Sequence, residues 1–320
     1  MKKNILFAVV AVLLCAILAI SVLNIVKIIG DKNEGNDQYT SRVIERDGIK
    51  YYPKQDITTL LLMGLDRTGP AVESNSYNNS ARADVVMVLV FDDINKKINV
   101  LNLNRDTILP VQVLGVNGFP AGTTSQQLAL AHTYGKGLRD SCENTKTTVS
   151  KYLSNLKIDY YASVSMDQIA VINDKLGGIT VNVTEDFSAV EPFIPKGEVT
   201  LSGEQASAYV RYRKDVDDQL NLSRMERQKK YLQGLFTSMS KKNSEDADAL
   251  LGLYNDISDY VVTDCSVQTI SNLLEKFSGY TLNEVVSPDG DNVKGTEFME
   301  FYVDEDHLDK IILDLFYSKK

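Results

Sequence analysis

Four arginines lie close together in the segment RYRKDVDDQLNLSRMERQ, residues 211–228, although the whole chain carries a formal net charge of −9. Arg211 and Arg213 are two residues apart, so an extended backbone would point both side chains to the same side. The planar guanidinium group of arginine binds phosphate through two parallel hydrogen bonds, which suits a strongly anionic ligand. The alternative is a solvated surface on which the arginines pair with nearby acids, namely Asp215, Asp217, Asp218 and Glu226.

The second half of this segment has helical spacing. Arg224, Arg227 and Gln228 stand at positions i, i+3 and i+4, which places them on one face of a helix. Arg224 also falls near the start of the predicted helix 222–239, where the backbone dipole favours an anion. These residues alone leave the anion site and the ion-paired surface open as alternatives.

Acidic and basic side chains also stand together at the ends of three predicted strands. Asp66 follows the apolar run TTLLLMGL, and Arg82 and Asp84 stand two residues apart at the start of another strand, hence on the same face. Arg105 and Asp106 follow a third apolar run. In α/β sheets polar residues at strand ends often face the ligand crevice, but each arginine–aspartate pair could instead be a local salt bridge that closes its strand.

The elements that would position these residues alternate between strands and helices, which predicts one α/β domain with a mixed sheet flanked by helices. The predicted strands are 58–65, 84–91, 97–104, 160–166, 179–183 and 297–303. The predicted helical segments are 127–137, 142–156, 167–178, 201–210, 222–239, 246–260, 266–277 and 305–317. Ser202 and Gln205 form a predicted capping box, and the polar stretch 66–84 predicts a loop.

The N-terminus predicts a membrane anchor. Residues 4–26 contain no charged side chain across 23 positions, and a helix of that length spans about 34 Å, enough to cross a bilayer core. No A-x-A-like cleavage site follows, which favours an uncleaved anchor over the alternative, a cleaved signal peptide. Lys2 and Lys3 favour a cytoplasmic N-terminus and therefore an extracellular domain.

This anchor gives a simple predicted organisation. Residues 1–30 form the cytoplasmic tip and the transmembrane helix, 31–56 a polar stalk, and 57–320 the extracellular domain. Within that domain the core motifs lie in 58–240, and 241–320 is a C-terminal extension. The predicted location is the cell membrane, with a single pass.

Composition excludes some classes of function. The 320 residues are 43% hydrophobic and 24% charged, which is typical of a globular protein, and the acidic balance argues against nucleic-acid binding. No C-x-x-C pair occurs and only His132 and His307 are present, which argues against a structural zinc site. Cys142 and Cys265 could pair outside the cell, but their spacing in sequence leaves a disulfide open.

Seven motifs in a fixed order resemble the LytR-CpsA-Psr family, and the resemblance is clear over residues 58–240. The motifs are LLLMGLD, ARADVVMVLVF, INVLNLNRDT, LALAHTYGKG, IDYYASVSMDQIAVINDKLGGITVNV, LSGEQASAYVRYR and NLSRMERQ. The resemblance implies a cell-wall glycopolymer ligase. Such an enzyme moves a glycan phosphate from undecaprenyl pyrophosphate to the C6 hydroxyl of N-acetylmuramic acid in peptidoglycan, with the polyprenyl tail in an apolar tunnel.

The resemblance also assigns residues. It implies that Asp66 and Asp84 hold Mg²⁺ and act with Arg105 in catalysis. The residues that it places on the pyrophosphate are Arg82, Arg105, Arg211, Arg213, Arg224, Arg227 and Gln228. Phosphoryl transfer requires mostly positioning and charge stabilisation, which arginines and a hard cation held by oxygen ligands supply.

Two features of the chain differ from the family pattern or stay open. The loop 67–81 is longer than expected, and His132 could be either a packed histidine or one that lines the site. The predicted partners are the lipid-linked glycopolymer (teichoic acid, capsule or similar), the peptidoglycan acceptor and the membrane. The alternatives to the ligase are a non-catalytic polyprenyl-phosphate-binding protein and a lipid pyrophosphatase. The presence of both Asp66 and Asp84 favours the enzyme.

Overall fold

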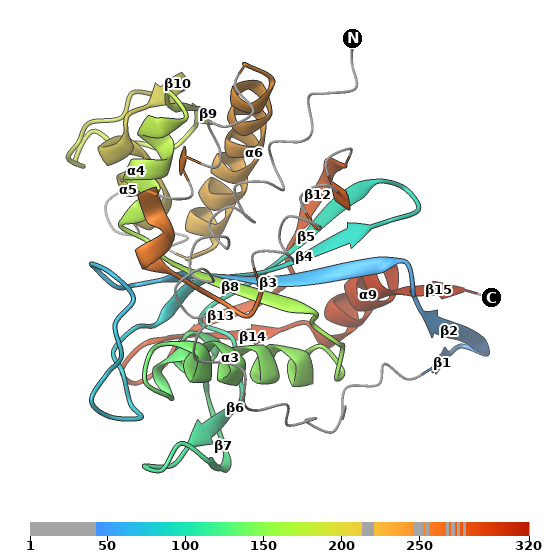
Figure 1. The fold of residues 1–320 in the computed structure, drawn as a ribbon. Coiled ribbons are helices and arrows are strands. Elements are labelled where there is room, and N and C mark those ends of the chain that lie inside the picture. The colour runs from blue at the N-terminus through green and yellow to red at the C-terminus, as the bar shows by residue number, and fades with distance from the viewer. Residues whose placement is uncertain are drawn as a thin grey trace.

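The structure is a computed structural model (Figure 1) that describes residues 43–212, 221–245, 252–253, 256–266, 269, 273, 276–277 and 280–319. The predicted anchor and most of the two helices predicted over 246–260 and 266–277 lie outside these residues. Within the part that the structure describes, no helix is both long enough and apolar enough to cross a membrane. The anchor and the extracellular location stay predictions.

A six-stranded mixed sheet forms the centre of the molecule, in the order β11–β8–β3–β4–β5–β12 (Figure 1). Adjacent strands among β3, β4 and β5 are antiparallel, whereas β8 runs parallel to β3 and β12 parallel to β5. The strands are β3 Ile57–Leu65, β4 Ala83–Asp92, β5 Lys97–Leu103, β8 Tyr160–Ser165, β11 Val261–Thr263 and β12 Thr281–Val286. The four central strands match the predicted ones to within one residue at each end.

Helices and smaller sheets cover both faces of the central sheet (Figure 1). The elements that pack on one face are α4 Gln168–Lys175, β9 Ile179–Val183, β10 Gly197–Leu201, α5 Gly203–Arg211 and α6 Asn221–Glu245. The elements that pack on the other are β6 Ile108–Leu114, the 3₁₀-helix η1 Leu128–Thr133, α3 Arg139–Tyr152 and α9 Glu305–Phe316. Other elements are β7 Pro120–Gln127, the 3₁₀-helix η2 Ser258–Tyr260, β13 Gly290–Lys294 and β14 Met299–Val303.

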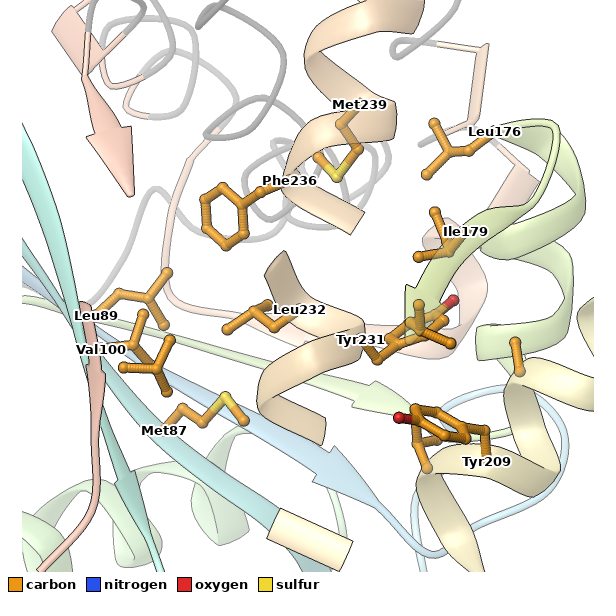
Figure 2. Close-up of a cluster of buried hydrophobic side chains, with 14 of the residues drawn as sticks. Met87, Leu89, Val100, Leu176, Ile179, Tyr209, Tyr231, Leu232, Phe236 and Met239 are labelled. Carbon is orange, nitrogen blue, oxygen red and sulfur yellow. The ribbon is translucent and has the colours of Figure 1, made fainter. Parts of the chain in front are cut away.

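The central strands read as continuous apolar runs because both of their faces are buried. Successive residues of a strand point to opposite faces, so Leu60 packs on the α6 side and Leu61 and Met63 pack on the α3 and α9 side. Figure 2 shows the α6 side, where Met87, Leu89 and Val100 of the sheet face Leu232 and Phe236 of the helix. The sheet therefore separates two apolar cores.

Part of the predicted stalk belongs to the domain. In the segment 31–56, residues Ile44–Arg46 (β1) and Ile49–Pro53 (β2) form a hairpin, and β2 pairs with β15, Tyr317–Lys319. The backbone N–H of Lys54 also donates to the carbonyl of Phe316 over 2.8 Å. Most side chains of β1 and β2 are exposed or half-buried, so their polar composition suits a small surface sheet as well as a connecting segment. The domain therefore begins before residue 57.

The segment 127–137 is helical over a shorter length than the sequence predicts. Only Leu128–Thr133 coils, as the 3₁₀-helix η1, and the chain then turns. Gly135 and Gly137 have φ angles of 107° and 84°, which are accessible to glycine and costly for other residues. These two glycines end the helical turn and lead the chain into α3.

The two described cysteines are free and buried, so the structure contains no disulfide between them. Cys142 lies in α3 with its Sγ 3.4 Å from Ser163 Oγ, and Cys265 follows β11. They belong to separate apolar cores on the two sides of the sheet. Burial raises the pKa of the Cys142 thiol to about 12, which keeps it protonated and unreactive.

Candidate active site

The two predicted metal-binding carboxylates lie at one edge of the sheet because β3 and β4 are antiparallel. Asp66 follows the end of β3, and Asp84 lies at the start of β4. The backbone N–H of Asp66 donates to the carbonyl of Arg82 over 2.8 Å, which fixes the two chain segments side by side. The strand register thus brings Asp66, Arg82 and Asp84 together although the loop between them is long.

A buried cluster of charged side chains surrounds Asp84. Arg105 donates through Nη1 to Asp84 and through Nε to Asp106, the latter over 3.2 Å. Arg224 Nη1 lies 3.8 Å from the second oxygen of Asp84. The exposed fractions of the side chains are 6% for Arg105, 3% for Arg224 and 13% for Asp84. Arg105 is held between two carboxylates, which restrains its position before any ligand arrives.

A more exposed group of charged side chains surrounds Asp66. Arg82 Nη2 lies 3.0 Å from one oxygen of Asp66, and Arg211 Nη2 lies 3.3 Å from the other. Each of the three side chains is more than a third exposed, so solvent screens these pairs and their net stabilisation is small. Arg82 and Arg211 are therefore suited to releasing Asp66 and binding an anionic ligand in its place.

The charges of this site do not balance. Four arginines, Arg82, Arg105, Arg211 and Arg224, face three carboxylates, Asp66, Asp84 and Asp106, which leaves one net positive charge. A local positive excess inside a chain of net charge −9 favours an anion at this position.

The structure changes the interpretation of Arg211 and Arg213. Arg211 is the last residue of α5 rather than part of an extended pair, and its side chain reaches Asp66 from the helix end. α5 begins with the predicted capping box: Ser202 Oγ accepts a hydrogen bond from Gln205 N, and Gln205 Oε1 accepts one from Ser202 N. Arg213 lies outside the described residues, so its predicted contact with the pyrophosphate stays a prediction.

Arg227 and Gln228 contact backbone carbonyls at the end of α5, and their predicted contact with the pyrophosphate stays a prediction. Arg227 donates through Nε to Tyr209 O over 2.7 Å and through Nη2 to Tyr212 O, and Gln228 Nε2 donates to Val210 O over 3.1 Å. The last carbonyls of a helix have no partner within the helix, so they attract nearby donors. Through these bonds α6 holds the end of α5, and with it Arg211, at the site.

The carboxylates are chemically suited to Mg²⁺. This cation is commonly bound by one or two carboxylates, substrate phosphates and water, and Asp66 and Asp84 supply that donor type. In the structure, arginine nitrogens contact the carboxylate oxygens of both residues. No group of three or more His, Cys, Asp and Glu side chains among the described residues could enclose a metal by itself. Magnesium binding stays a prediction, and it would require the arginines to move toward phosphate.

An apolar pocket of about 130 Å³ lies between the sheet and α6, next to the arginine cluster. Gln228 lines it one helical turn after Arg224, which joins the pocket to the charged site. Its walls come from β3, β4, β8, α4, α5 and α6 and include Leu62, Met87, Val164, Ile172, Tyr231 and Leu235. The pocket can take a short length of hydrocarbon; a tunnel for a complete polyprenyl tail stays a prediction.

His132 is a packed histidine rather than one that lines the site. It is fully buried, and its Nδ1 lies 2.8 Å from the carbonyl oxygen of Ala81. Burial is the main cause that lowers the pKa of His132 to about 4. The neutral ring supports the segment that leads into β4.

This histidine should make stability depend on pH. Its folded pKa lies below the unfolded value of 6.5, so the unfolded chain binds the proton more readily and stability falls as the pH drops from about 6.5 to 4. We expect this group alone to lower the free energy of unfolding by about 2 kcal/mol between pH 7 and pH 5. Urea unfolding at both values tests this, with His132→Asn as the variant in which that loss should disappear. An unchanged loss in the variant would contradict it.

Comparison with known proteins identifies the family. A profile of the LytR_cpsA_psr family matches residues 25–314, which include every predicted site residue. The chain belongs to the LytR_cpsA_psr family. This membership confirms the resemblance that the seven motifs indicate, and the family match extends beyond both ends of the motif region 58–240.

The family members that the chain resembles include two transferases of Bacillus subtilis. It is 30% identical over 182 residues to the polyisoprenyl-teichoic acid–peptidoglycan teichoic acid transferase TagU, covering 57% of this chain and 52% of TagU. It is 29% identical over 234 residues to the corresponding transferase TagV, covering 71% of this chain and 54% of TagV. The chain thus spans about half the length of these curated relatives.

Solved structures of the family share the fold. The crystal structure of B. subtilis TagV aligns with a TM-score of 0.60 and 27% identity, covering 82% of this chain and 96% of that chain. A structure of TagT bound to LIIa-WTA aligns with a TM-score of 0.61 and 22% identity, covering 82% and 90%. The mixed sheet flanked by helices is therefore a shared architecture of the family.

Proposed function

We propose that the protein is a membrane-anchored phosphotransferase that attaches a polyprenyl-pyrophosphate-linked anionic glycopolymer to N-acetylmuramic acid of peptidoglycan. The observation that carries this proposal is the arginine cluster of Arg82, Arg105, Arg211 and Arg224, with its one net positive charge, beside an apolar pocket. A ligand with a pyrophosphate head and a hydrocarbon tail fits both parts at once. The names of the relatives TagU and TagV, which describe transfer of teichoic acid from a polyisoprenyl carrier to peptidoglycan, support the same reaction.

In the proposed reaction the arginines bind and stabilise charge. Arg105 and Arg224, which contact Asp84, hold the pyrophosphate. Arg82 and Arg211 leave Asp66 and bind the outer oxygens of the pyrophosphate instead. Charge that develops on the leaving phosphate is then met by donors already in position. A bound Mg²⁺, held by Asp66 and Asp84, would neutralise further phosphate charge.

The transfer exchanges one phosphorus–oxygen bond for another. The C6 hydroxyl oxygen of the acceptor bonds to the phosphorus that carries the glycan, the bond to the bridging oxygen breaks, and polyprenyl phosphate leaves with that electron pair. The hydroxyl proton passes to solvent on the open side of the site, where 36% of the Asp66 side chain is exposed against 13% for Asp84.

The ligand class can be tested on the purified full-length protein. Mass spectrometry of lipids extracted from the protein should detect polyprenyl phosphate or pyrophosphate. The apolar pocket and the arginines would then hold the two ends of one molecule. Extracts that contain only bilayer phospholipids, at the level found on an unrelated anchored protein, would count against a polyprenyl ligand.

Blocking the apolar pocket should weaken binding of a long-chain lipid. Leu235 lies on α6 and lines the pocket, so Leu235→Trp would fill space that the hydrocarbon needs. We expect an increase of about tenfold in the Kd for a polyprenyl phosphate, because the hydrocarbon tail would have to displace the larger tryptophan side chain from a packed site. Inorganic pyrophosphate should bind unchanged. Gln233→Trp, at an exposed position of the same helix, is the control; equal effects at both positions would contradict the assignment.

A further inference from the structure

A second pocket opens at Asp66 and differs in character from the apolar one. It is formed by the loop that joins β3 to β4 (light blue in Figure 1) and by residues 136–137. Its volume is about 580 Å³, against about 130 Å³ for the apolar pocket. Hydroxyl and amide side chains line much of it, namely Thr68, Ser74, Asn78, Asn79 and Ser80. Such a lining suits a polar ligand with many hydroxyl and amide groups.

The walls of this pocket are held in place by hydrogen bonds. Asn79 Nδ2 donates to the carbonyls of His132 over 2.9 Å and of Gly135 over 3.1 Å. The backbone N–H of Ser74 donates to Lys136 O over 2.8 Å. These bonds fix the loop to the segment between η1 and α3, so the pocket exists before a ligand binds.

Arg67 gives this pocket a positive charge that has no direct ion-pair partner among the described residues, although Asp167 acts on it electrostatically from beyond ion-pair distance. Its guanidinium donates to two neutral groups, Ser165 Oγ over 3.1 Å and Gly137 O over 3.4 Å. Its buried Nη2 has no partner among the described residues, and none of their carboxylates forms an ion pair with it. By contrast, Lys136 in the same pocket pairs with Glu73 over 2.9 Å. A half-buried cation of this kind is stabilised by an anionic group on a ligand.

We propose that this pocket binds the acceptor, a strand of N-acetylated amino sugars that carries acidic groups, and that Arg67 attracts one of those groups. The proposal rests on the proposed function, because it places the acceptor beside Asp66, where the sugar hydroxyl must meet the pyrophosphate. Donor and acceptor then approach Asp66 from different pockets, the lipid tail in the apolar pocket and the sugar strand in the polar one. The long loop 67–81 is, on this account, the acceptor-binding element of the chain.

Asn78 provides the first test. Its side chain is exposed, lines the pocket and makes no hydrogen bond that the described residues account for, so Asn78→Ala should leave the fold unchanged. We expect the Kd of the full-length protein for a soluble peptidoglycan fragment, measured by calorimetry, to rise roughly three- to tenfold, as for the loss of one or two hydrogen bonds. Asn75→Ala, an exposed asparagine of the same loop outside the pocket, is the matched control and should bind like the wild type.

Arg67 provides the second test, with the charge of the ligand as the variable. The wild type should bind the acidic peptidoglycan fragment more tightly than an uncharged chitooligosaccharide of the same length. Arg67→Gln should abolish this preference, and Arg67→Lys, which keeps the charge, should restore most of it. Thermal unfolding of both variants shows whether each is folded at the temperature of the binding experiment.

The outcomes separate this inference from the proposed function. A wild type that binds neither sugar, or Asn78 and Arg67 variants that bind like the wild type, would overturn the acceptor pocket. Binding that these variants weaken supports the pocket even if the wild type transfers nothing, and that failure would count against the proposed reaction alone. A transfer reaction in which both variants keep the wild-type KM for peptidoglycan would overturn the pocket and leave the reaction standing.

Discussion

Replacing Arg105 by alanine is expected to reduce glycopolymer transfer at least about a thousandfold, the order of effect seen when an arginine that stabilises phosphoryl-transfer charge is removed. Arg105 is 5% exposed as a residue and is held between Asp84 and Asp106. A solvent-exposed side chain therefore cannot replace its guanidinium group at this position. Transfer from a lipid-linked glycopolymer to peptidoglycan, with release of polyprenyl phosphate as the readout, measures the effect.

The controls for Arg105→Ala distinguish lost chemistry from lost folding. Removing this arginine leaves two buried carboxylates with fewer partners, which costs stability, although Arg224 still faces Asp84 and Gln127 still donates to Asp106. Arg105→Lys keeps the charge without the planar contact and should retain partial activity. Arg46→Ala removes an exposed ion pair to Asp309 and should transfer like the wild type. A folded Arg105→Ala protein with full activity would refute the phosphate assignment.

Replacing Asp84 by asparagine should separate binding from turnover. The substitution keeps the shape of the side chain but raises the net charge of the described site from one positive to two. We therefore expect polyprenyl phosphate to bind at least as tightly without added metal, while transfer falls about a hundredfold or more because a charged group of the site is lost. Equilibrium binding and single-turnover transfer, both performed on the full-length protein with and without Mg²⁺, measure the two effects.

Asp264 offers a matched control for Asp84. Both side chains are 13% exposed and both are paired with a basic residue, but Asp264 pairs with Lys146 away from the arginine cluster. Asp264→Asn should change stability only. If Asp84→Asn weakens lipid binding and transfer by the same factor, Asp84 acts by holding the arginines, and its proposed part in the reaction is wrong.

The sequence predicts the central sheet well because burial on both faces leaves an unmistakable pattern. Most positions of β3 and β4 are apolar, and their apolar side chains pack into one of two cores. The surface strands β1 and β2 lack this pattern, since none of their side chains is buried, and polar composition therefore suggests a stalk. The pairing of β2 with β15 links residues more than 250 positions apart, which local sequence cannot reveal.

The structure brings several of the predicted site residues together, but the sequence predicts their contacts less well. Strand ends place Asp66 and Asp84 together, and helical spacing places Arg224 on the same side as Gln228. The expectation of an extended backbone at Arg211 is wrong, because α5 continues to that residue and its side chain leaves from the helix end. Local sequence also does not show that Arg227 contacts the carbonyls at the end of α5, and its contact with the pyrophosphate stays a prediction.

Arg67 was not predicted at all, although it directly follows Asp66 in the sequence GLDR. Nothing in that short motif shows that the side chain becomes half-buried without an acidic partner. That property arises from the fold of the long loop and from the segment 135–137 that borders it. A cation next to a strand-end aspartate could have been noted as a candidate, but its role depends on tertiary contacts.

The most direct test of the proposed reaction is a transfer experiment with the purified full-length protein, a polyprenyl-pyrophosphate-linked glycopolymer, peptidoglycan strands and Mg²⁺. The account predicts a new phosphodiester between the glycopolymer and the C6 oxygen of N-acetylmuramic acid, detected by mass spectrometry of digested strands, with one polyprenyl phosphate released per bond formed. Product should be absent with Arg105→Ala and present with Arg46→Ala. Release of polyprenyl phosphate with water as the only acceptor, and no glycan on peptidoglycan, would contradict it.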